Sequence, residues 1–500
     1  MPRTTDPEYD VIVVGGGPGG STVATLTAMR GARVLLLEKE RFPRYQIGES
    51  LLPATVHGIG KLLGVLPELE AARFTTKRGG TFRWGKNPEP WTFAFAVSSR
   101  FPGPTSTAYQ VERMRFDQIL LDNARRKGVE VRERCPVVDV LEAGGRGTDA
   151  RRDGPGERGT GECSDDPDGR GTDVRSDDSD RRVTGVRFDD PDGTRREVRA
   201  RFVVDASGNG SRIHGRTGGR RVYSEFFKNI ALFGYFEGGS RLPEPNSGNI
   251  LCAAFDSGWF WYIPLTDRLT SVGAVLHHDA LDRVQGDREK ALAGLIEECP
   301  LIAAYLADAR RVTTGPYGEV RVRKDYSYCQ EKFWRPGMAL VGDAACFIDP
   351  VFSSGVHLST YSALLAARSI NTVLSGGAGS PSETRCFEEF EARYRDEFGR
   401  FHDFLMSFYD MRQDSDSYFW SARRITHATG SPLEAFVELV GGGASDEGAL
   451  FDSPFVDATL EAGAKVQVQA ALGESFDDEP IRENGLVPSL DGMHWTDPRT

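Results

Sequence analysis

The sequence has few of the features that hold metals or form disulfides. Its seven cysteines form no C-x-x-C pair, and its eight histidines form no H-x-x-H or H-E-x-x-H pattern. An odd number of scattered cysteines is typical of reduced thiols in the cytoplasm. We therefore expect a cytoplasmic protein that holds no metal ion.

Long apolar runs and net positive charge are also lacking. No segment reaches the roughly 18 to 20 continuous apolar residues that a membrane span needs. The first ten residues, MPRTTDPEYD, are too polar for a signal peptide. The formal net charge of −12 disfavours a nucleic-acid partner and electrostatic attachment to a membrane, but it is compatible with a neutral substrate or a docked protein.

The N-terminal part of the chain has the pattern of a strand, a helix and a second strand. Residues 10–14 (DVIVV) form a short apolar run, a glycine cluster follows, and residues 33–37 (RVLLL) form a second run that ends at Glu38. This order predicts a βαβ unit with parallel strands. A chain of 500 residues exceeds what one hydrophobic core usually organises, so we expect two or three packed units.

The remaining chain alternates between strand-like and helical patterns. Strands are expected within 80–110, 129–142, 183–189, 196–204 and 220–280, and helices at 111–127, 283–309 and 385–440. Residues 338–345 (MALVGDAA) predict a strand followed by a helix. The aromatic residues of 385–440 are explained either by ordinary core packing or by a helix that covers a substrate channel.

The glycine cluster contains G-x-G-x-x-G at Gly15, Gly17 and Gly20. The first glycine permits a tight turn, the second lets the backbone approach a pyrophosphate, and the third permits close packing of helix on strand. The helix N-terminus supplies free N–H groups, and Glu38 ends the second strand where a carboxylate can accept hydrogen bonds from a ribose. The motif in this context predicts a dinucleotide site, but it does not by itself separate FAD from NAD.

Two later segments favour FAD. Residues 341–345 (VGDAA) follow an apolar strand, and an aspartate at Asp343 can bind the ribityl or pyrophosphate region of a flavin. Residues 204–211 (VDASGNGS) form a second strand-to-turn crossing. Each segment alone could be a loop, so it is their order along the chain that favours FAD.

These segments together resemble the FAD monooxygenase superfamily of the p-hydroxybenzoate hydroxylase type. The resemblance covers roughly residues 8 to 375 and includes Arg113, which resembles the arginine that contacts FAD in that superfamily. Three further stretches are similar to flavin-dependent halogenases. Residues 259–264 (WFWYIP) match W-x-W-x-I-P, residues 42–50 run from FPR to GES, and residues 349–356 (DPVFSSGV) match the D-P-x-x-S-x-G loop.

The resemblance implies a role for each matched residue. FAD is expected to contact Gly15, Gly17, Pro18, Gly19, Gly20, Ser21, Glu38, Arg44, Glu49, Ser50, Arg113, Asp343, Gly355 and Val356. Chloride is expected at Ser354 and Gly355, whose backbone can form an anion nest. Lys77 stands where the family places its catalytic lysine, and Trp259, Trp261, Ile263 and Pro264 are expected to keep substrate away from the flavin.

The implied fold is α/β: a Rossmann-type FAD-binding domain with an inserted mixed β-sheet substrate domain and a helical C-terminal region. We expect the FAD-binding domain at 1–80, 106–215 and 315–380, and the substrate domain at 81–105 and 216–314. The C-terminal region, 385–500, should be helical and then acidic and irregular. Residues 144–182 carry too few apolar side chains to offset the entropy of ordering and should be a disordered insertion.

In such enzymes reduced flavin and dioxygen oxidise chloride to hypochlorite, which a lysine directs to an aromatic ring. The sequence has no second Rossmann fingerprint, so reduced FAD (FADH2) should come from a separate flavin reductase. Phe352 stands where tryptophan halogenases carry a glutamate, which argues against free tryptophan. We expect instead a phenol (tyrosyl) or pyrrole tethered to an acyl or peptidyl carrier protein, in natural-product biosynthesis.

Two other functions stay open at this point. An aromatic hydroxylase on the same scaffold would explain the FAD motifs and leave the W-x-W-x-I-P and Lys77 matches as accidents. A flavin-binding protein without turnover would have no use for Lys77, Ser354 and Gly355. The mass added to a product, chlorine or oxygen, separates the two enzymes.

Overall fold

The computed structural model describes residues 7–143, 181–324, 327–377, 379–445, 447–451 and 480–499. The insertion that the sequence predicts to be disordered, 144–182, falls outside these ranges except for its last two residues. Residues 452–479 of the acidic C-terminal region also lie outside them. Within the described ranges, no helix is both long and apolar enough to cross a membrane.

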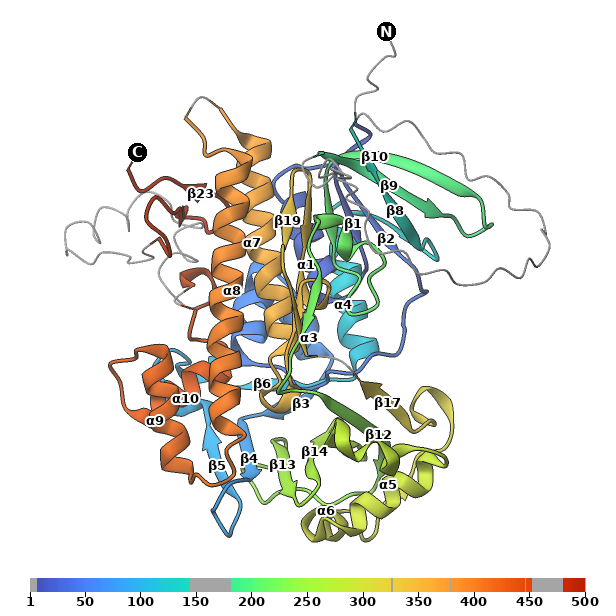
Figure 1. The fold of residues 1–500 in the computed structure, drawn as a ribbon, viewed down its shortest axis with the longest axis vertical. Coiled ribbons are helices and arrows are strands. Elements are labelled where there is room, and N and C mark those ends of the chain that lie inside the picture. Colours follow the sequence, from blue (N-terminus) through green and yellow to red (C-terminus); the bar gives the residue numbers. More distant parts are fainter. Residues whose placement is uncertain are drawn as a thin grey trace, which may run out of the picture.

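The first sheet is the parallel sheet that the N-terminal pattern predicts (Figure 1). Its strands lie in the order β19 (Trp334–Arg335), β20 (Met338–Leu340), β10 (Arg195–Asp205), β1 (Tyr9–Val14), β2 (Val34–Glu38) and β7 (Glu130–Glu133). All neighbours are parallel except β19 and β20. The sheet continues from β10 through antiparallel β9 (Val183–Asp189) and β8 (Val137–Glu142).

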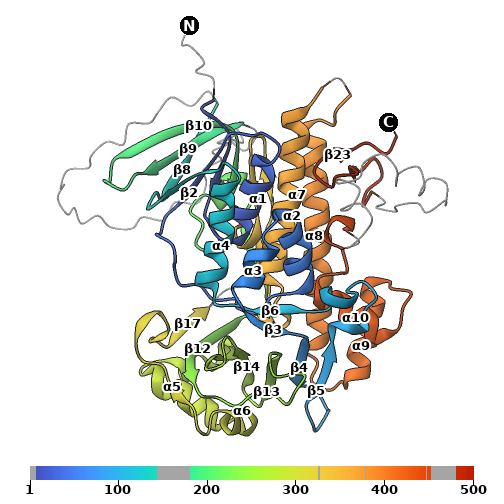
Figure 2. The same cartoon turned by 180° about the vertical axis from the view of Figure 1, so that it is seen from behind.

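Three helices pack around the first sheet, as a parallel sheet with buried strands requires. They are α1 (Pro18–Ala28), α4 (Arg113–Arg126) and α7 (Gly355–Ser375). Helix α1 contacts both α4 and α7, and Figure 2 shows α1 and α4 in front of the strands. The short helices α2 (Gly60–Leu63) and α3 (Leu66–Ala71) follow β2 along the chain.

The second sheet lies at the opposite end of the molecule from the β8–β9 extension (Figure 1). Its strands lie in the order β16 (Arg310–Arg311), β12 (Asn229–Glu237), β15 (Leu269–His277), β14 (Gly258–Pro264), β13 (Ile250–Phe255), β4 (Gly79–Arg83) and β5 (Trp91–Ala94), and β17 (Arg321–Lys324) pairs with β12. The predicted helix at 283–309 is present as α5 (Arg288–Glu297) and α6 (Pro300–Tyr305).

Successive side chains of β14 show which core each face of the second sheet contacts. Phe260 and Tyr262 join the small core under α5 and α6, whereas Trp259, Trp261 and Ile263 join the large core shared with the first sheet. A strand points successive side chains to opposite faces, so the tryptophans of this strand are on the side of the first sheet. Two of the smaller sheets are β3 (Thr75–Lys77) with β6 (Ala108–Gln110), and β11 (Arg221–Tyr223) with β18 (Tyr328–Gln330) and β21 (Cys346–Phe347).

The C-terminal region is helical, as predicted. Helix α8 (Glu383–Phe408) runs beside α7, and α9 (Ser415–Thr426) and α10 (Pro432–Gly441) pack near its end (Figure 1). Its aromatic residues Phe401, Phe404 and Phe408 are fully buried, so core packing explains them. The chain ends with the paired strands β22 (Val487–Pro488) and β23 (Trp495–Thr496).

One predicted element differs. The sequence predicts a helix directly after the strand at 338–345, but Gly342–Ala344 form a single 3-10 turn, β21 follows, and α7 begins only at Gly355. Gly342 has a φ of +58°, which starts a turn rather than an α-helix, and Pro350 disfavours the helical conformation at the residue before it. The helix that follows this strand, α7, therefore begins only after a turn, a short strand and a loop.

The domain boundaries stay a prediction, but two strands, β4 and β17, lie across them. The second sheet includes Gly79 and Gly80 of β4 and all of β17, residues that the expected boundaries place with the FAD-binding domain. The junction between the two parts therefore runs through pairs of strands rather than through an extended linker.

A buried ion pair attaches the C-terminal region to α7. Both Arg368 and Glu447 are 0% exposed and their side chains are joined by hydrogen bonds of 2.8 and 2.9 Å. Arg368 Nε also donates to the carbonyl of Gly492 at 2.7 Å.

Because Glu447→Gln leaves a buried guanidinium without its counter-charge, we expect it to lower the free energy of unfolding by about 3–5 kcal/mol. Urea denaturation followed by circular dichroism measures this loss. The matched control is Glu197→Gln, which removes an exposed pair with Arg187 and should cost less than about 1 kcal/mol. Equal losses in the two variants would show that the buried pair does not hold this region.

Candidate active site

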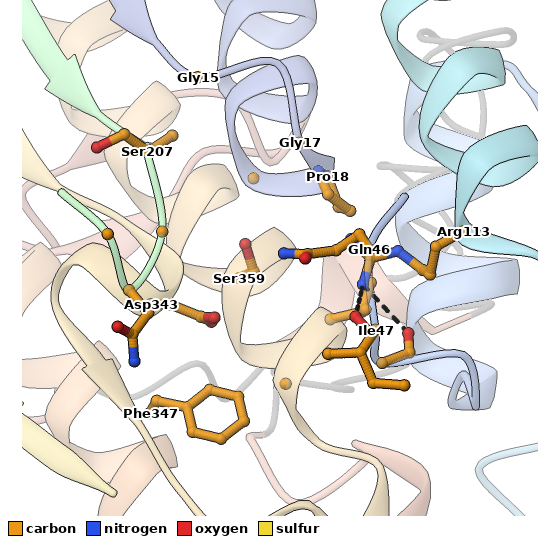
Figure 3. Close-up of a pocket in the computed structure, with 18 of the residues that line it drawn as sticks. Gly15, Gly17, Pro18, Gln46, Ile47, Arg113, Ser207, Asp343, Phe347 and Ser359 are labelled. Carbon is orange, nitrogen blue, oxygen red and sulfur yellow. Dashed lines mark hydrogen bonds between the residues drawn. The ribbon is translucent and has the colours of Figure 1, made fainter. Parts of the chain in front are cut away.

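A cavity of about 550 Å³ lies where the two sheets meet. Residues at the carboxyl ends of β1, β2, β10 and β20 line one side, and β12, β13 and β14 of the second sheet contribute to the other. Ligands of open α/β sheets bind outside the carboxyl ends of the strands. Figure 3 shows Gly15, Gly17 and Pro18 above this space, Gln46, Ile47 and Arg113 on one wall, and Asp343 and Phe347 on another.

Most of the residues predicted to bind FAD lie on this cavity. It is lined by Gly15, Gly17, Pro18, Gly19, Glu38, Arg44, Glu49, Ser50, Arg113, Asp343, Gly355 and Val356. Of the predicted shielding residues, Trp259, Trp261 and Ile263 also line it. Five of the predicted site residues are described in the structure but do not line the cavity: Gly20, Ser21, Lys77, Ser354 and Pro264.

The glycine turn is built by close approach of backbones. Gly15 has a φ of +101°, and a Cβ there would lie 2.6 Å from the carbonyl oxygen of Ala206. A Cβ on Gly20 would lie 1.9 Å from the carbonyl oxygen of Gly15. Gly20 therefore acts through packing rather than by contact with the cavity. Ser21 likewise supports the turn, since its Oγ donates to the carbonyl of Gly16 at 3.0 Å.

Glu38 ends β2 beside this turn, as predicted, and is only 4% exposed. Its Oε2 accepts a 2.6 Å hydrogen bond from the backbone N–H of Gly16, and its Oε1 accepts one of 2.8 Å from Glu40. The carboxylate therefore holds the glycine turn in place. Each oxygen keeps a further lone pair with which to accept a ribose hydroxyl.

Two arginines are held near the turn by one aspartate. Arg113 donates to Asp117 through Nε at 2.7 Å and Nη2 at 3.0 Å, and Arg44 donates to the same carboxylate at 3.0 Å. Arg113 Nη1 also donates to the carbonyl of Ile47 at 2.7 Å (Figure 3). Sequence reasoning missed Asp117, although its i, i+4 spacing from Arg113 on a helix is a usable signal.

The donors around the cavity fit FAD. A Cβ on Gly17 would lie 3.4 Å from Arg44 Nη2, so this guanidinium stands beside the N-terminus of α1. Free N–H groups, a helix dipole and fixed arginines suit an anionic pyrophosphate. Burial raises the pKa of Asp343 to about 6, against the opposing effect of Arg323 and Arg113. A carboxyl of this kind can both accept and donate hydrogen bonds to a flavin.

Several cavity residues were not among the predicted site residues. Gln46 and Ile47 lie within the stretch matched from FPR to GES, but neither was singled out. Arg323, Phe347 and Ser359 reach the cavity from β17, β21 and α7. Their positions depend on pairing between distant segments, which no local pattern reveals.

Lys77 ends β3 and is 2% exposed. Its Nζ donates to the Oγ of Ser50 at 2.9 Å and to the carbonyl of Leu51 at 3.0 Å, and it stands 5.5 Å from the ring centre of Phe95. Burial lowers the pKa of Lys77 to about 7. Lys77 is thus joined to the cavity through Ser50, which lines it, and at neutral pH a large fraction of its amine is uncharged.

The loop from Asp349 to Gly355 leads from β21 to α7. Asp349 Oδ2 accepts from Asn229 at 2.8 Å, its Oδ1 accepts from the backbone of Val351 at 3.2 Å, and burial raises its pKa to about 6. Ser353 has a φ of +62°, which turns the chain into the helix. The buried Oγ of Ser354 has no hydrogen-bond partner among the described residues, although it stands at the N-terminus of α7.

The tryptophans of β14 are fixed by their ring N–H groups. Trp259 Nε1 donates to Tyr409 Oη at 2.8 Å, and Trp261 Nε1 donates to Ser271 Oγ at 3.2 Å. A Cβ on Gly273 would lie 2.3 Å from the ring of Trp261, so a glycine on β15 makes room for this indole. Both rings are held in one orientation on the cavity wall.

A buried carboxyl and two tyrosines form a chain on the same wall. Tyr235 Oη donates to Glu49 Oε1 at 2.8 Å, and the hydroxyls of Tyr235 and Tyr45 are 2.7 Å apart. Burial raises the pKa of Glu49 to about 7, while the hydroxyls of Ser271 and Tyr235 and the guanidinium of Arg113 oppose this rise. The chain runs from a fully buried carboxyl to Tyr45, which is only partly buried.

Fold and site together fit a protein that binds a dinucleotide in a cavity between two sheets. The Tryptophan halogenase family matches residues 10–103 and 164–469 of the chain. Tryptophan 2-halogenase of Chondromyces crocatus is 33% identical over 428 residues, which cover 83% of this chain and 71% of that protein. Flavin-dependent halogenase gsfI of Penicillium aethiopicum is 32% identical and covers 75% of this chain and 67% of its own length.

Solved structures agree with these relatives. The myxobacterial chondrochloren halogenase CndH, described as a variant of FAD-dependent halogenases, is 53% identical with a TM-score of 0.74, over 98% of this chain and 99% of that one. The flavin-dependent halogenase CmlS is 29% identical with a TM-score of 0.69, over 99% of this chain and 84% of that one. The chain therefore belongs to the tryptophan halogenase family and is an FAD-dependent halogenase.

The glycine turn gives a test of the FAD site. We expect Gly20→Ala to lower the affinity for FAD at least about tenfold, a change of about 1.4 kcal/mol, because the added methyl displaces the carbonyl of Gly15 and with it the turn. Titration of flavin fluorescence measures the affinity. Gly294→Ala on α5, where no atom lies within 4 Å of the added Cβ, is the control and should leave the affinity unchanged. Equal affinities in both variants would contradict the packing role of Gly20.

Glu49, on the cavity wall, and Lys77, behind it, have shifted pKa values that predict opposite pH dependences of stability. The folded protein keeps a proton on Glu49 between its ordinary pKa of 4.5 and about 7, so the free energy of unfolding should fall as pH rises through that window. The folded protein releases the Lys77 proton between about 7 and 10.5, so stability should rise there. Each slope is at most about 1.4 kcal/mol per pH unit.

Urea denaturation of the wild type and two variants across this pH range measures both effects. Relative to wild type, Glu49→Gln should remove the fall below pH 7 and Lys77→Met should remove the rise above it. Glu319→Gln, at an exposed carboxylate, is the control. A wild-type profile parallel to both variants would show that neither group changes its pKa on folding.

Proposed function

We propose that this FAD-dependent halogenase uses dioxygen and chloride to chlorinate an electron-rich aromatic ring. The observation that carries the proposal is the position of Lys77, a buried amine held by Ser50 and Leu51 at the edge of the flavin cavity. A surface lysine would be charged and solvated, whereas an uncharged amine can bind or react with hypochlorous acid. Lys77 is therefore the residue that directs the oxidant to substrate.

The chloride ion is proposed to bind at the start of α7. This helix has 21 residues, so its N-terminus offers unpaired N–H groups and the positive end of a dipole. The Ser354 hydroxyl is buried and has no other hydrogen-bond partner in the described chain, and Gly355 faces the cavity beside it. These donors match what a desolvated anion needs.

Glu49 is proposed to hold the proton that the reaction consumes. Oxidation of chloride to hypochlorous acid takes up one proton, and a carboxyl whose pKa is raised to about 7 by burial is still partly protonated at neutral pH. Tyr235 and Tyr45 connect it to the partly exposed side of the protein.

Trp259 and Trp261, fixed on the wall, are proposed to keep the ring of the substrate away from the flavin.

The substrate is proposed to be a phenol or pyrrole tethered to a carrier protein. Phe352 packs against the rings of Phe82, Phe404, Phe408 and Phe436, so apolar side chains surround the position where tryptophan halogenases carry a glutamate. A ring with its own hydroxyl or nitrogen donor stabilises the charged intermediate without that carboxylate.

Reduced FAD is proposed to come from a separate flavin reductase, since the chain has a single Rossmann fingerprint.

The test incubates the protein with reduced FAD, dioxygen and either chloride or bromide, and reads products by mass spectrometry. Substrates are free tryptophan, free phenols and pyrroles, and their tyrosyl and pyrrolyl thioesters on a carrier protein. We expect one chlorine on the carrier-bound rings. A gain of oxygen would overturn the proposed chlorination in favour of hydroxylation, and equal rates on free and tethered rings would overturn the proposed carrier protein.

The Lys77→Ala variant should lose chlorination by at least about a hundredfold, as expected for loss of a residue that handles the oxidant, and should bind FAD as the wild type does. Lys290→Ala, at an exposed lysine of α5, is the matched control and should keep full activity.

Reduction of bound flavin by NADH at catalytic rates in the purified protein would contradict the need for a reductase.

A further inference from the structure

Two cysteines face each other on neighbouring strands beside the flavin cavity. Strands β18 and β21 are antiparallel, and Cys329 is the register partner of Cys346. Both are free thiols. Cys346 lies between Asp343 and Phe347, two residues that line the cavity and are labelled in Figure 3.

The register places these cysteines at the closer type of cross-strand pair. The backbone N–H of Gln330 donates to the carbonyl of Ala345 at 2.8 Å, so Gln330 and Ala345 form a hydrogen-bonded pair. Pairs alternate along an antiparallel ladder, and the next pair, Cys329 with Cys346, is therefore of the non-hydrogen-bonded type. The Cα atoms of such pairs are about 4.5 Å apart, which lies within the range of about 4.4–6.8 Å that disulfides span.

The surroundings make Cys329 the more reactive thiol. Its pKa is lowered, first by a hydrogen bond from the Cys346 thiol and then by Arg395, whose Nη1 lies 3.3 Å from the sulfur, and these effects outweigh burial and Glu391, which raise it. Cys329 is also half-buried rather than fully buried. A partly exposed sulfur in contact with a cation is the environment of a reactive cysteine.

The other described cysteines differ in each respect. Burial raises the pKa of Cys135, Cys252, Cys299 and Cys386, and all four are buried. Cys346 is also buried and its pKa is raised, so it is suited to the second step of a dithiol reaction rather than the first.

We infer that Cys329 and Cys346 form a reversible cross-strand disulfide, with hydrogen peroxide as the oxidant. The Cys329 thiolate takes one oxygen atom from hydrogen peroxide, which breaks the O–O bond and releases one water after protonation. The Cys346 thiol then attacks the resulting sulfenic sulfur, forms the S–S bond and releases a second water. In total two thiols and one hydrogen peroxide give one disulfide and two waters.

The chemistry of the protein accounts for exposure to this oxidant. Reduced flavin yields hydrogen peroxide when dioxygen oxidises it without halogenation, and β21 borders the cavity where the flavin would lie. Tyr328, beside Cys329 on β18, donates to the carbonyl of Asp343 at 2.6 Å. Strand β18 thus already contacts the turn at Asp343. A disulfide would also bind β18 covalently to β21, the strand that follows this turn.

The test treats the full chain with hydrogen peroxide, blocks free thiols, and maps peptides without reduction by mass spectrometry. We expect a crosslinked peptide pair containing Cys329 and Cys346, and an upward shift in Tm, both reversed by dithiothreitol. Because the oxidant is added, the result does not depend on halogenation or on its substrate. Absence of oxidation, or a crosslink between any other two cysteines, would overturn the inference.

Variants separate the two sulfurs. Cys329→Ser should lose both the crosslink and the shift in Tm. Cys346→Ser should leave Cys329 as a sulfenic acid that dimedone traps. Cys299→Ser, at a buried cysteine between α5 and α6, is the matched control that keeps the crosslink. If the buried Cys346→Ser variant fails to fold, wild type and Cys329→Ser still decide the outcome. Dimedone labelling of Cys329 in peroxide-treated wild type without a crosslink would contradict the role of Cys346.

Discussion

The active site depends on one close approach between backbones. Gly15 lies against the carbonyl of Ala206 and Gly20 lies against the carbonyl of Gly15, so β1, β10 and α1 converge with no space for a side chain. The convergence directs the N-terminus of α1 at the cavity, and Glu38 fixes it through the N–H of Gly16. A methyl group at this point would move the helix, the turn and both strand ends together.

The ionisable side chains inside the protein are of two kinds. Asp117 holds Arg113 and Arg44, and Glu447 holds Arg368, so these ion pairs fix elements in place. Glu49 and Lys77 are buried and Asp343 is partly buried, all with weaker compensation, and each has a pKa brought toward neutrality. Perturbed groups gathered at one cavity are typical of a catalytic site.

The residues that sequence reasoning located are those whose role is local. The glycine turn and the acidic end of β2 follow from short-range geometry, and W-x-W-x-I-P is a short motif that resembles flavin-dependent halogenases. Residues of all three reach the cavity. The expected helix after residue 345 was wrong because Gly342 and Pro350 interrupt it, a conflict that a strand-then-helix pattern does not show. Gly20 and Ser21 do not line the cavity and support the turn from behind, while their predicted role at the cofactor stays a prediction.

The sequence alone determined the fold class, the dinucleotide turn and the family, because these depend on the order and spacing of residues along a few short segments. Only the tertiary structure decided that Lys77 is buried against Ser50, that Tyr235 reaches Glu49, and that Cys329 faces Cys346. Their reactivity depends on loss of water and on partners brought from distant parts of the chain. Those effects arise when sheets and helices pack, so no local pattern in the sequence carries them.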